Sequence, residues 1–260
     1  MTLNKDLRIK IVEMISKARE GHIPSSFSIL DIIHFIYMNV LKFRKNNPNW
    51  VKRDYFILSK GHGCAALYVV LNKLGILKTK DILNYSSAKG ILGGHPDSTI
   101  VPGAEASTGS LGHGFPTAIG LALGLKIQKK KNKIFVLVGD GECHEGTIWE
   151  SANIAANLNL GNVCAIIDWN GSAAQLMPKD DLANKWKSFG WKTFITDGHS
   201  NRALKKTFKK IRFGLDGTPS VILAKTTKGK GVSFLEGHGK WHHKIPNQEE
   251  KIKIINELSK

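Results

Sequence analysis

Residues 133–138 read KIFVLV, and residues 139–146, which follow them directly, read GDGECHEG. An apolar run without polar alternation is typical of a strand that is buried on both faces of a parallel sheet. A second run of this kind, residues 163–168 (VCAIID), precedes Trp169-Asn170-Gly171-Ser172. Residues 147–158, between the two runs, have the pattern of a helix, so this stretch predicts a βαβ unit with parallel strands.

The same alternation continues on both sides of this unit. Three further strands are expected at residues 55–59 (YFILS), 191–196 and 220–224 (SVILA). Helices are expected at residues 3–20, 28–41, 64–74, 115–128, 147–158, 181–189, 201–212 and 248–259. Ser28 is a suitable N-cap for the second of these helices. The sequence therefore predicts an α/β fold, with a doubly wound, mainly parallel sheet and helices on both faces, in a single domain over residues 1–260.

Composition narrows the class of protein. Of the 260 residues, 42% are hydrophobic and 23% are charged, which argues against a disordered chain. The three cysteines, Cys64, Cys143 and Cys164, form no Cys-x-x-Cys pair and fit a reducing compartment, so we expect a cytoplasmic protein. Residues 1–20 lack the apolar stretch of a signal peptide, and no run has the length of a spanning helix, so no membrane partner is expected.

The chain is strongly basic, with 38 Lys and Arg against 21 Asp and Glu, a formal net charge of +17. Its lysine runs, at residues 126–133, 205–212, 225–230 and from Lys251 onward, fall in expected loops or helix ends. The sequence has no RNA-recognition aromatic signature, zinc-finger spacing or helix-turn-helix pattern. We interpret the charge as a solvated lysine-rich surface or as complementarity to an acidic partner protein, and we expect no nucleic-acid partner.

Polar residues follow the two central strands. In a parallel sheet, ligands bind beyond the carboxyl ends of the strands, so Asp140 and Asn170 should lie at one edge. Both offer the hard oxygen ligands that Mg²⁺ prefers, and the glycines around Asp140 permit close approach to a bulky anion. A Gly-Asp-Gly followed by an Asn after the next strand, with 28 residues between (142–169), matches the thiamine diphosphate fingerprint. The alternative is two ordinary turns, which also favour Gly, Asp and Asn.

Other ligand classes fit less well. The sequence has no G-x-x-x-x-G-K-[ST] phosphate loop, and no strand is expected directly before Gly109-x-x-Gly112-x-Gly114, which disfavours a dinucleotide site. Cys143-His144-Glu145 has no second ligand pair at a spacing suited to zinc.

Histidines recur in glycine- or proline-bearing stretches, such as His22 (EGHIP), His62 (SKGHGC), His95 (GGHPD), His113 (SLGHG) and His242-His243 (GKWHHKIP). A single loop histidine is usually just exposed. Several beside a diphosphate site suggest a polyhydroxylated substrate, whose hydroxyl groups need donors, acceptors and acid–base groups that titrate near neutral pH.

These motifs together resemble the N-terminal, diphosphate-binding domain of transketolase. The motifs GHIPSS, SKGHG, GGHPD, STGSLGHG, GDGECHEG, DWNG, KTTKGKGVSF and WHHKIP occur in the family's order along nearly the whole chain. The resemblance implies thiamine-diphosphate-dependent transfer of a two-carbon ketol unit from a ketose or ketose phosphate to an aldose or aldose phosphate.

The resemblance also implies roles for individual residues. The metal, Mg²⁺ or else Ca²⁺ or Mn²⁺, would be held by the side chains of Asp140 and Asn170 and the main-chain carbonyl of Ser172. Cofactor-binding residues would be His62, Gly109, Ser110, Leu111, Gly141, Asn170 and His242. Catalytic residues facing the sugar would be His22, His95 and His242. Glu145 and Glu150 match acidic positions that face the partner domain, although a glutamate near a helix N-terminus has a simpler explanation in the helix dipole.

Some positions depart from the family pattern. His22-Ile23-Pro24 replaces a common His-Pro-Gly, His113 stands where glutamine is frequent, and Ser172 is small where an apolar residue is usual. His242 is chosen over His243 because it follows the tryptophan of a Trp-His pattern.

The sequence has no counterpart of the family's pyrimidine-binding and C-terminal domains. We therefore expect one subunit of a split transketolase, active only with a second polypeptide that carries the pyrimidine-binding domain, in an α2β2 assembly. Alternatives are a subunit with 1-deoxyxylulose-5-phosphate synthase-type chemistry, a ketolase of a specialised sugar pathway, and a non-catalytic thiamine-diphosphate-binding protein.

Overall fold

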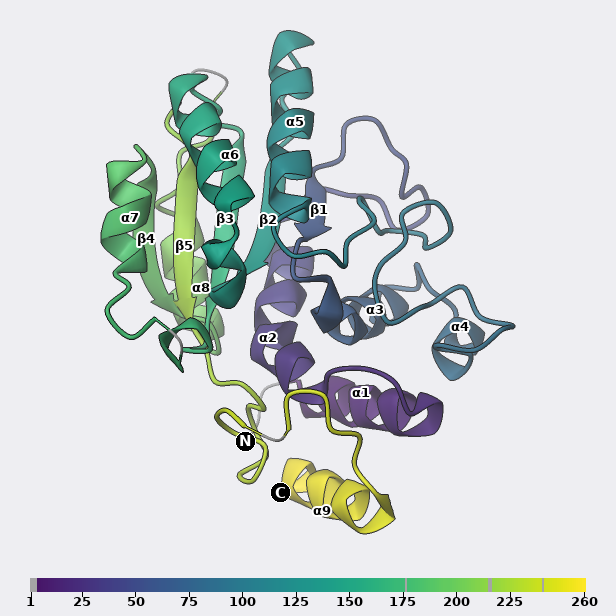
Figure 1. Cartoon of the computed structure of the whole chain (residues 1–260). Coiled ribbons are helices and arrows are strands. Elements are labelled where there is room, and N and C mark those ends of the chain that lie inside the picture. The colour runs from purple at the N-terminus through teal and green to yellow at the C-terminus, as the bar shows by residue number, and fades with distance from the viewer. Residues whose placement is uncertain (1–3, 176, 215–216, 240) are drawn as a thin grey trace.

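One parallel sheet forms the centre of the computed structural model, which describes residues 4–175, 177–214, 217–239 and 241–260 (Figure 1). Its strands, in the order β1-β2-β3-β5-β4, are all parallel to their neighbours. They are β1 (Tyr55–Leu58), β2 (Ile134–Gly139), β3 (Val163–Trp169), β4 (Lys192–Asp197) and β5 (Ser220–Lys225). The predicted α/β fold is confirmed, and each predicted strand agrees with the observed one to within a residue at either end.

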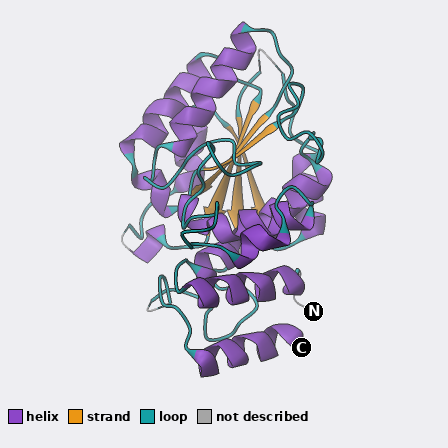
Figure 2. Ribbon diagram, turned by 90° about the vertical axis from the view of Figure 1, so that its right-hand side faces the viewer, coloured by secondary structure: helices purple, strands orange, loops and turns teal. Residues whose placement is uncertain are grey.

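Helices cover both faces of the sheet, as Figure 2 shows in a view along it. One face carries α2 (Ile23–Asn39), α3 (Cys64–Lys73) and α8 (Asn201–Phe208), and the other carries α5 (Gly114–Ile127), α6 (Gly146–Asn157) and α7 (Leu182–Ser188). Successive side chains of β2 enter these two cores alternately, Phe135 and Leu137 on one side and Val136 and Val138 on the other. The strand is apolar throughout because both of its faces are buried.

The two ends of the described chain lie together. Helix α1 (Lys5–Ala18) packs against α9 (Gln248–Ser259), beside α2 and α3 (Figure 1). A capping box of Asn247 and Glu250 begins α9. The short helix α4 (Thr79–Leu83) is not anticipated by the sequence pattern. Among the described residues, no helix has the length and apolar composition needed to span a bilayer.

The start of α2 differs from the sequence prediction. The helix begins at Ile23, with His22 at the N-cap and Pro24 in the first turn, rather than at Ser28. Proline favours this position because its fixed φ suits the first turn, where its missing N–H has no partner to lose. Ser28 lies inside the helix, where its hydroxyl donates a 2.7 Å hydrogen bond to Asp168 at the end of β3.

Candidate functional site

Asp140 and Asn170 lie at the carboxyl edge of the sheet, one after β2 and the other after β3. The strand register pairs Gly139 with Asp168, and the Asp140 amide donates to the Asp168 carbonyl at 3.2 Å. The Asp140 carboxylate accepts from the amides of Gly141 (2.8 Å) and Gly171 (2.7 Å), one in each turn. One carboxylate therefore joins the two turns that the sequence predicts to be neighbours.

Asn170 points its amide groups in two directions. Its Nδ2 donates to Asp168 Oδ2 at 2.8 Å, while its Oδ1 accepts from the amide (3.0 Å) and the hydroxyl (2.6 Å) of Ser172. The amide oxygen therefore lies toward Ser172. Asn170 and Ser172, both predicted metal ligands, are in direct contact.

The donors available to a cation here are oxygens. Among the described residues, no group of three or more His, Cys, Asp or Glu side chains is arranged to hold a metal. Burial, together with the nearby charge of Asp168, raises the pKa of the Asp140 carboxyl, and a divalent cation would offset that. One carboxylate with amide and main-chain oxygens fits an Mg²⁺ ion that takes its remaining ligands from a diphosphate and water.

Asp168 has a different part in the site. Its Oδ2 lies 2.5 Å from Lys60 Nζ, and both side chains are buried, 0% and 2% exposed. Thr226 also donates to its Oδ1, at 2.5 Å. Burial raises the pKa of Asp168, but the Lys60 charge and these hydrogen bonds outweigh it and hold the pKa below the usual value. Because protein donors already occupy both of its oxygens, Asp168 supports Asn170 from beneath rather than offering a metal ligand.

Glu142 connects the segment of Gly109, Ser110 and Leu111 to the turn after β2. Its carboxylate accepts from the hydroxyl of Ser59 (2.5 Å) and the amides of Gly112 (3.0 Å) and Gly139 (3.1 Å). Leu111 is half-buried and Ser110 exposed, while a Cβ at Gly109 would lie 3.4 Å from the His95 ring. A Cβ at Gly141 would meet no other atom within 4 Å, so its backbone faces open space.

Four imidazole rings converge beside these turns. The ring centroid of His22 lies 5.2 Å from that of His62, 5.4 Å from that of His242 and 4.5 Å from that of His243. The rings of His62 and His242 are 6.0 Å apart. The structure thus brings together three predicted histidines from the N-terminus of α2, the turn after β1 and the 241–243 segment. It adds His243 as a fourth.

Three of these rings are uncharged at neutral pH. Burial and then the charge of Lys60 lower the pKa of His62 to about 2. Burial, followed by His243, lowers the pKa of His22 to about 4, and burial and Lys228 lower the pKa of His242. A neutral imidazole has one donor and one acceptor nitrogen, so it can both receive and supply a hydroxyl proton. Nδ1 of His22 is buried and lacks a hydrogen-bond partner among the described residues.

His95, His243 and Glu20 lie on the outer side of the His22 ring. His95 is exposed, and its charge is close enough to contribute to the lowered pKa of His22. Nε2 of His243 is 3.7 Å from the carboxylate of Glu20, and both side chains are exposed. These groups therefore form the solvent side of the imidazole cluster.

Lys228 joins the imidazole cluster to the turn after β3. Its Nζ lies 2.7 Å from Nδ1 of His242 and 3.5 Å from the Ser172 hydroxyl, and the residue is only 7% exposed. Burial, and then the charge of Lys60, lower its pKa. The sequence pattern did not single out Lys228, Lys60, Asp168 or Glu142 as site residues. Their signal is the presence of charged residues inside otherwise buried motifs.

Glu145 and Glu150 are both exposed at the start of α6. Glu145 occupies the N-cap position, but its side chain makes no capping hydrogen bond. Contact of these two carboxylates with a partner stays a prediction.

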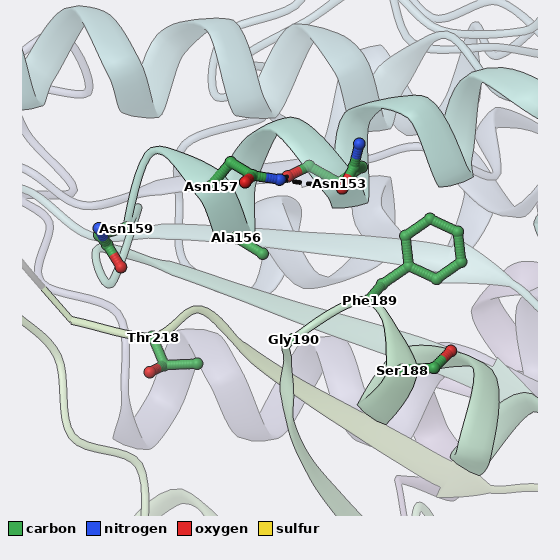
Figure 3. Close-up of a pocket in the computed structure, with 8 residues that line it drawn as sticks. All are labelled: Asn153, Ala156, Asn157, Asn159, Ser188, Phe189, Gly190 and Thr218. Atoms are coloured by element: carbon green, nitrogen blue, oxygen red, sulfur yellow. Dashed lines mark hydrogen bonds between the residues drawn. The ribbon is translucent and has the colours of Figure 1, made fainter.

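The cluster is distinct from the hollow drawn in Figure 3, which has a volume of about 410 Å³. That hollow lies between the C-terminal end of α6, the residues after α7 and Thr218, at the amino-terminal ends of β4 and β5. Its lining is of amides, hydroxyls and one phenyl ring, Phe189. A smaller hollow of about 230 Å³ adjoins the site, bordered by Lys228, His242 and Trp241.

Comparison with known proteins agrees with this geometry. Residues 2–258 match the family model described as the transketolase, thiamine diphosphate binding domain. The chain is 36% identical to one of the named subunits of apulose-4-phosphate transketolase from Phocaeicola vulgatus, over 97% of this chain and 91% of that protein. It is 35% identical to the 6-deoxy-6-sulfo-D-fructose transketolase subunit SqwG of a Clostridium species, over 98% and 94%.

The solved structures that it resembles are longer proteins. It superposes on transketolase from Campylobacter jejuni with a TM-score of 0.88 and 27% identity, covering 97% of this chain and 41% of that one. The chain thus spans about two fifths of that transketolase, but more than nine tenths of the two subunits named above. The chain belongs to the transketolase family of transferases and is that family's thiamine diphosphate binding domain.

Proposed function

We propose that this chain is the diphosphate-binding subunit of a two-subunit, Mg²⁺-dependent transketolase. The observation that carries the proposal is the contact of Lys228 with both His242 and Ser172, which makes one site of the histidine cluster and the Asp140–Asn170 pair. Its near full-length relatives that are named as transketolase subunits support the two-subunit organisation.

The cofactor's diphosphate would lie above the two turns that Asp140 joins. Asp140, the Asn170 amide oxygen and the Ser172 carbonyl would hold the cation, and the open backbone at Gly141 allows close approach of the phosphates. The ammonium of Lys228 would add positive charge on the side of His62. Burial of these groups strengthens their electrostatic interactions with a diphosphate.

Thiamine diphosphate, when bound, supplies the nucleophile and the electron sink for cleavage and formation of the carbon–carbon bond. The chain's own contribution is to bind sugar hydroxyls and to move their protons. His22, with an unpartnered buried Nδ1, and His242, with Nδ1 occupied by Lys228, would present neutral imidazole nitrogens to those hydroxyls. His95 would contact the sugar from the solvent side.

A partner subunit would complete the site. We propose that it carries the pyrimidine-binding domain and that two copies of each polypeptide form an α2β2 assembly. The exposed Glu145 and Glu150 would face it, and the excess of positive charge on this chain would favour an acidic partner. A cytoplasmic location stays a prediction.

Substrate assays on the reconstituted complex test the function. We expect transfer of a two-carbon unit from a ketose phosphate to an aldose phosphate, dependent on thiamine diphosphate and abolished by EDTA. Turnover of pyruvate without turnover of ketoses would instead identify the synthase-type reaction. Cofactor binding by a complex that turns over neither class of donor would indicate the non-catalytic alternative.

A further inference from the structure

A buried ionic network lies behind the site and is centred on Asp31. This residue, in the middle of α2, is 1% exposed and accepts two hydrogen bonds from the guanidinium of Arg8, at 3.1 and 2.8 Å. Its Oδ2 also lies 2.7 Å from Nδ1 of His199, which stands between β4 and α8. Burial raises the pKa of Asp31, but the hydrogen bonds from His199 and Arg8 outweigh it and lower the pKa.

Both ends of this network reach the loop that carries Lys228. Nε of Arg8 donates to the carbonyl of Lys230 at 2.9 Å, and the amide of Thr227 donates to Nε2 of His199, also at 2.9 Å. The Gly229 amide between them donates to the carbonyl of Pro24, in the first turn of α2, at 3.0 Å. The backbone on both sides of Lys228 is therefore anchored to α1, α2 and the turn before α8.

The hydrogen bonds of His199 define its tautomer. Because the Thr227 amide can only donate, Nε2 must accept and carries no proton. Nδ1 therefore holds the proton and donates it to Asp31. His199 acts as a relay of fixed length between a carboxylate in α2 and a backbone amide in the loop, and a side chain without both groups cannot replace it.

We propose that His199, held by Asp31 and Arg8, is a positioning residue for the cofactor site. It fixes the backbone of residues 226–230 and thereby the approach of Lys228 to His242 and Ser172. His199 itself touches neither of those groups. This inference rests on the proposed function, because it assigns the network to the binding of a diphosphate cofactor.

Three substitutions of His199 separate its two hydrogen bonds. His199→Gln places an amide N and O near the positions of the two ring nitrogens and can keep both bonds. His199→Asn reaches only the Nδ1 position, so it keeps the bond to Asp31 and loses the acceptor for Thr227. His199→Ala loses both. Ser200→Ala is the matched control, because it removes the N-cap of α8 next door without touching the loop.

The first readout is amide hydrogen exchange of residues 226–232 in the full chain without cofactor. Loss of a hydrogen bond with a net value near 1.4 kcal/mol corresponds to about tenfold. We expect about tenfold faster exchange in His199→Asn and His199→Ala, and near wild-type exchange in His199→Gln and Ser200→Ala. The second readout is the Kd of thiamine diphosphate with Mg²⁺, which should rise five- to tenfold in the first pair only. Turnover of the complex at saturating cofactor should stay within about twofold.

Two results would overturn the inference. One is unchanged exchange in His199→Asn; the other is faster exchange with an unchanged Kd, which would make the network structural only. If the wild-type chain and complex bind no thiamine diphosphate, the proposed function fails instead, and the assignment of this network to a cofactor site fails with it. The exchange data then still report whether His199 holds the loop.

Discussion

Lys228 Nζ donates a 2.7 Å hydrogen bond to Nδ1 of His242. This contact leaves Nε2 as the nitrogen of His242 that is available to a substrate. It also places a buried positive charge between the histidine cluster and the turn that carries Asn170 and Ser172. The contact therefore links the part of the site suited to proton transfer with the part suited to a diphosphate.

Replacement of Lys228 by methionine should weaken cofactor binding. A charge-assisted hydrogen bond contributes about 1.5–3 kcal/mol, so we expect the Kd of thiamine diphosphate to rise by roughly 10- to 100-fold. Lys225→Met is the matched control, since Lys225 is exposed and lies over the ring of Trp169. Isothermal titration of both variants measures the effect, and an equal loss in the two would assign it to general charge.

Asp140→Asn should abolish the dependence of cofactor binding on Mg²⁺ while the chain stays folded. The amide keeps an oxygen for the Gly141 or Gly171 amide, but it removes the carboxylate from the proposed ligand set. We expect affinity for the Mg²⁺–cofactor complex to fall by at least about 100-fold. The exposed Asp6, changed to Asn, provides the control. Unchanged Mg²⁺-dependent binding in Asp140→Asn would remove the metal assignment.

His242 and His243 should differ in their effects on turnover. His242→Ala should lower kcat of the complex by about 10²- to 10⁴-fold, the range of a lost acid–base group, with cofactor affinity mostly intact. His243→Ala, on the solvent side near Glu20, should change kcat by less than about tenfold. Steady-state kinetics with separate cofactor titrations measure both. Parallel loss of turnover and cofactor affinity in His242→Ala would mean that this residue places the cofactor instead.

The free chain should lose stability as the pH falls below 6.5. The folded state keeps His62 neutral because its pKa is about 2, whereas an unfolded histidine takes up a proton near 6.5. Each pH unit in this window then lowers the free energy of unfolding by up to about 1.4 kcal/mol. Between pH 6.5 and 4.5, wild type should lose roughly 2–3 kcal/mol more than His62→Asn.

Urea unfolding of the free chain at several pH values measures that difference. The exposed His113, changed to Asn, should follow wild type. Identical pH dependence in wild type and His62→Asn would show that the free chain does not hold His62 as a buried neutral ring.

The strands and the neighbouring positions of Asp140 and Asn170 could be predicted because both depend on local pattern. Runs buried on two faces are apolar throughout, and parallel topology sends their carboxyl ends to one edge. The start of α2 was predicted wrongly because Ser28 is a good N-cap by type. Its hydroxyl instead bonds to Asp168, 140 residues along the chain, which no local pattern reveals.

The buried charges behind the site could not be predicted for the same reason. Lys60, Glu142 and His199 each bind groups from distant segments, at sequence separations of 108, 83 and 168 residues for Asp168, Ser59 and Asp31. The motifs place such residues near the right strand ends, but their partners depend on how the strands are ordered. The convergence of His22, His62 and His242 likewise follows from the tertiary fold.

The most direct test of the account is to purify the tagged chain from its own cells and to assay ketol transfer with the material recovered. The account predicts a stoichiometric companion that carries a pyrimidine-binding domain, and thiamine-diphosphate- and Mg²⁺-dependent transfer that requires both polypeptides. A chain that returns alone as a homo-oligomer and transfers a ketol unit by itself would contradict the two-subunit organisation. A chain that returns alone and remains inactive after cofactor is added would contradict the proposed enzymatic function.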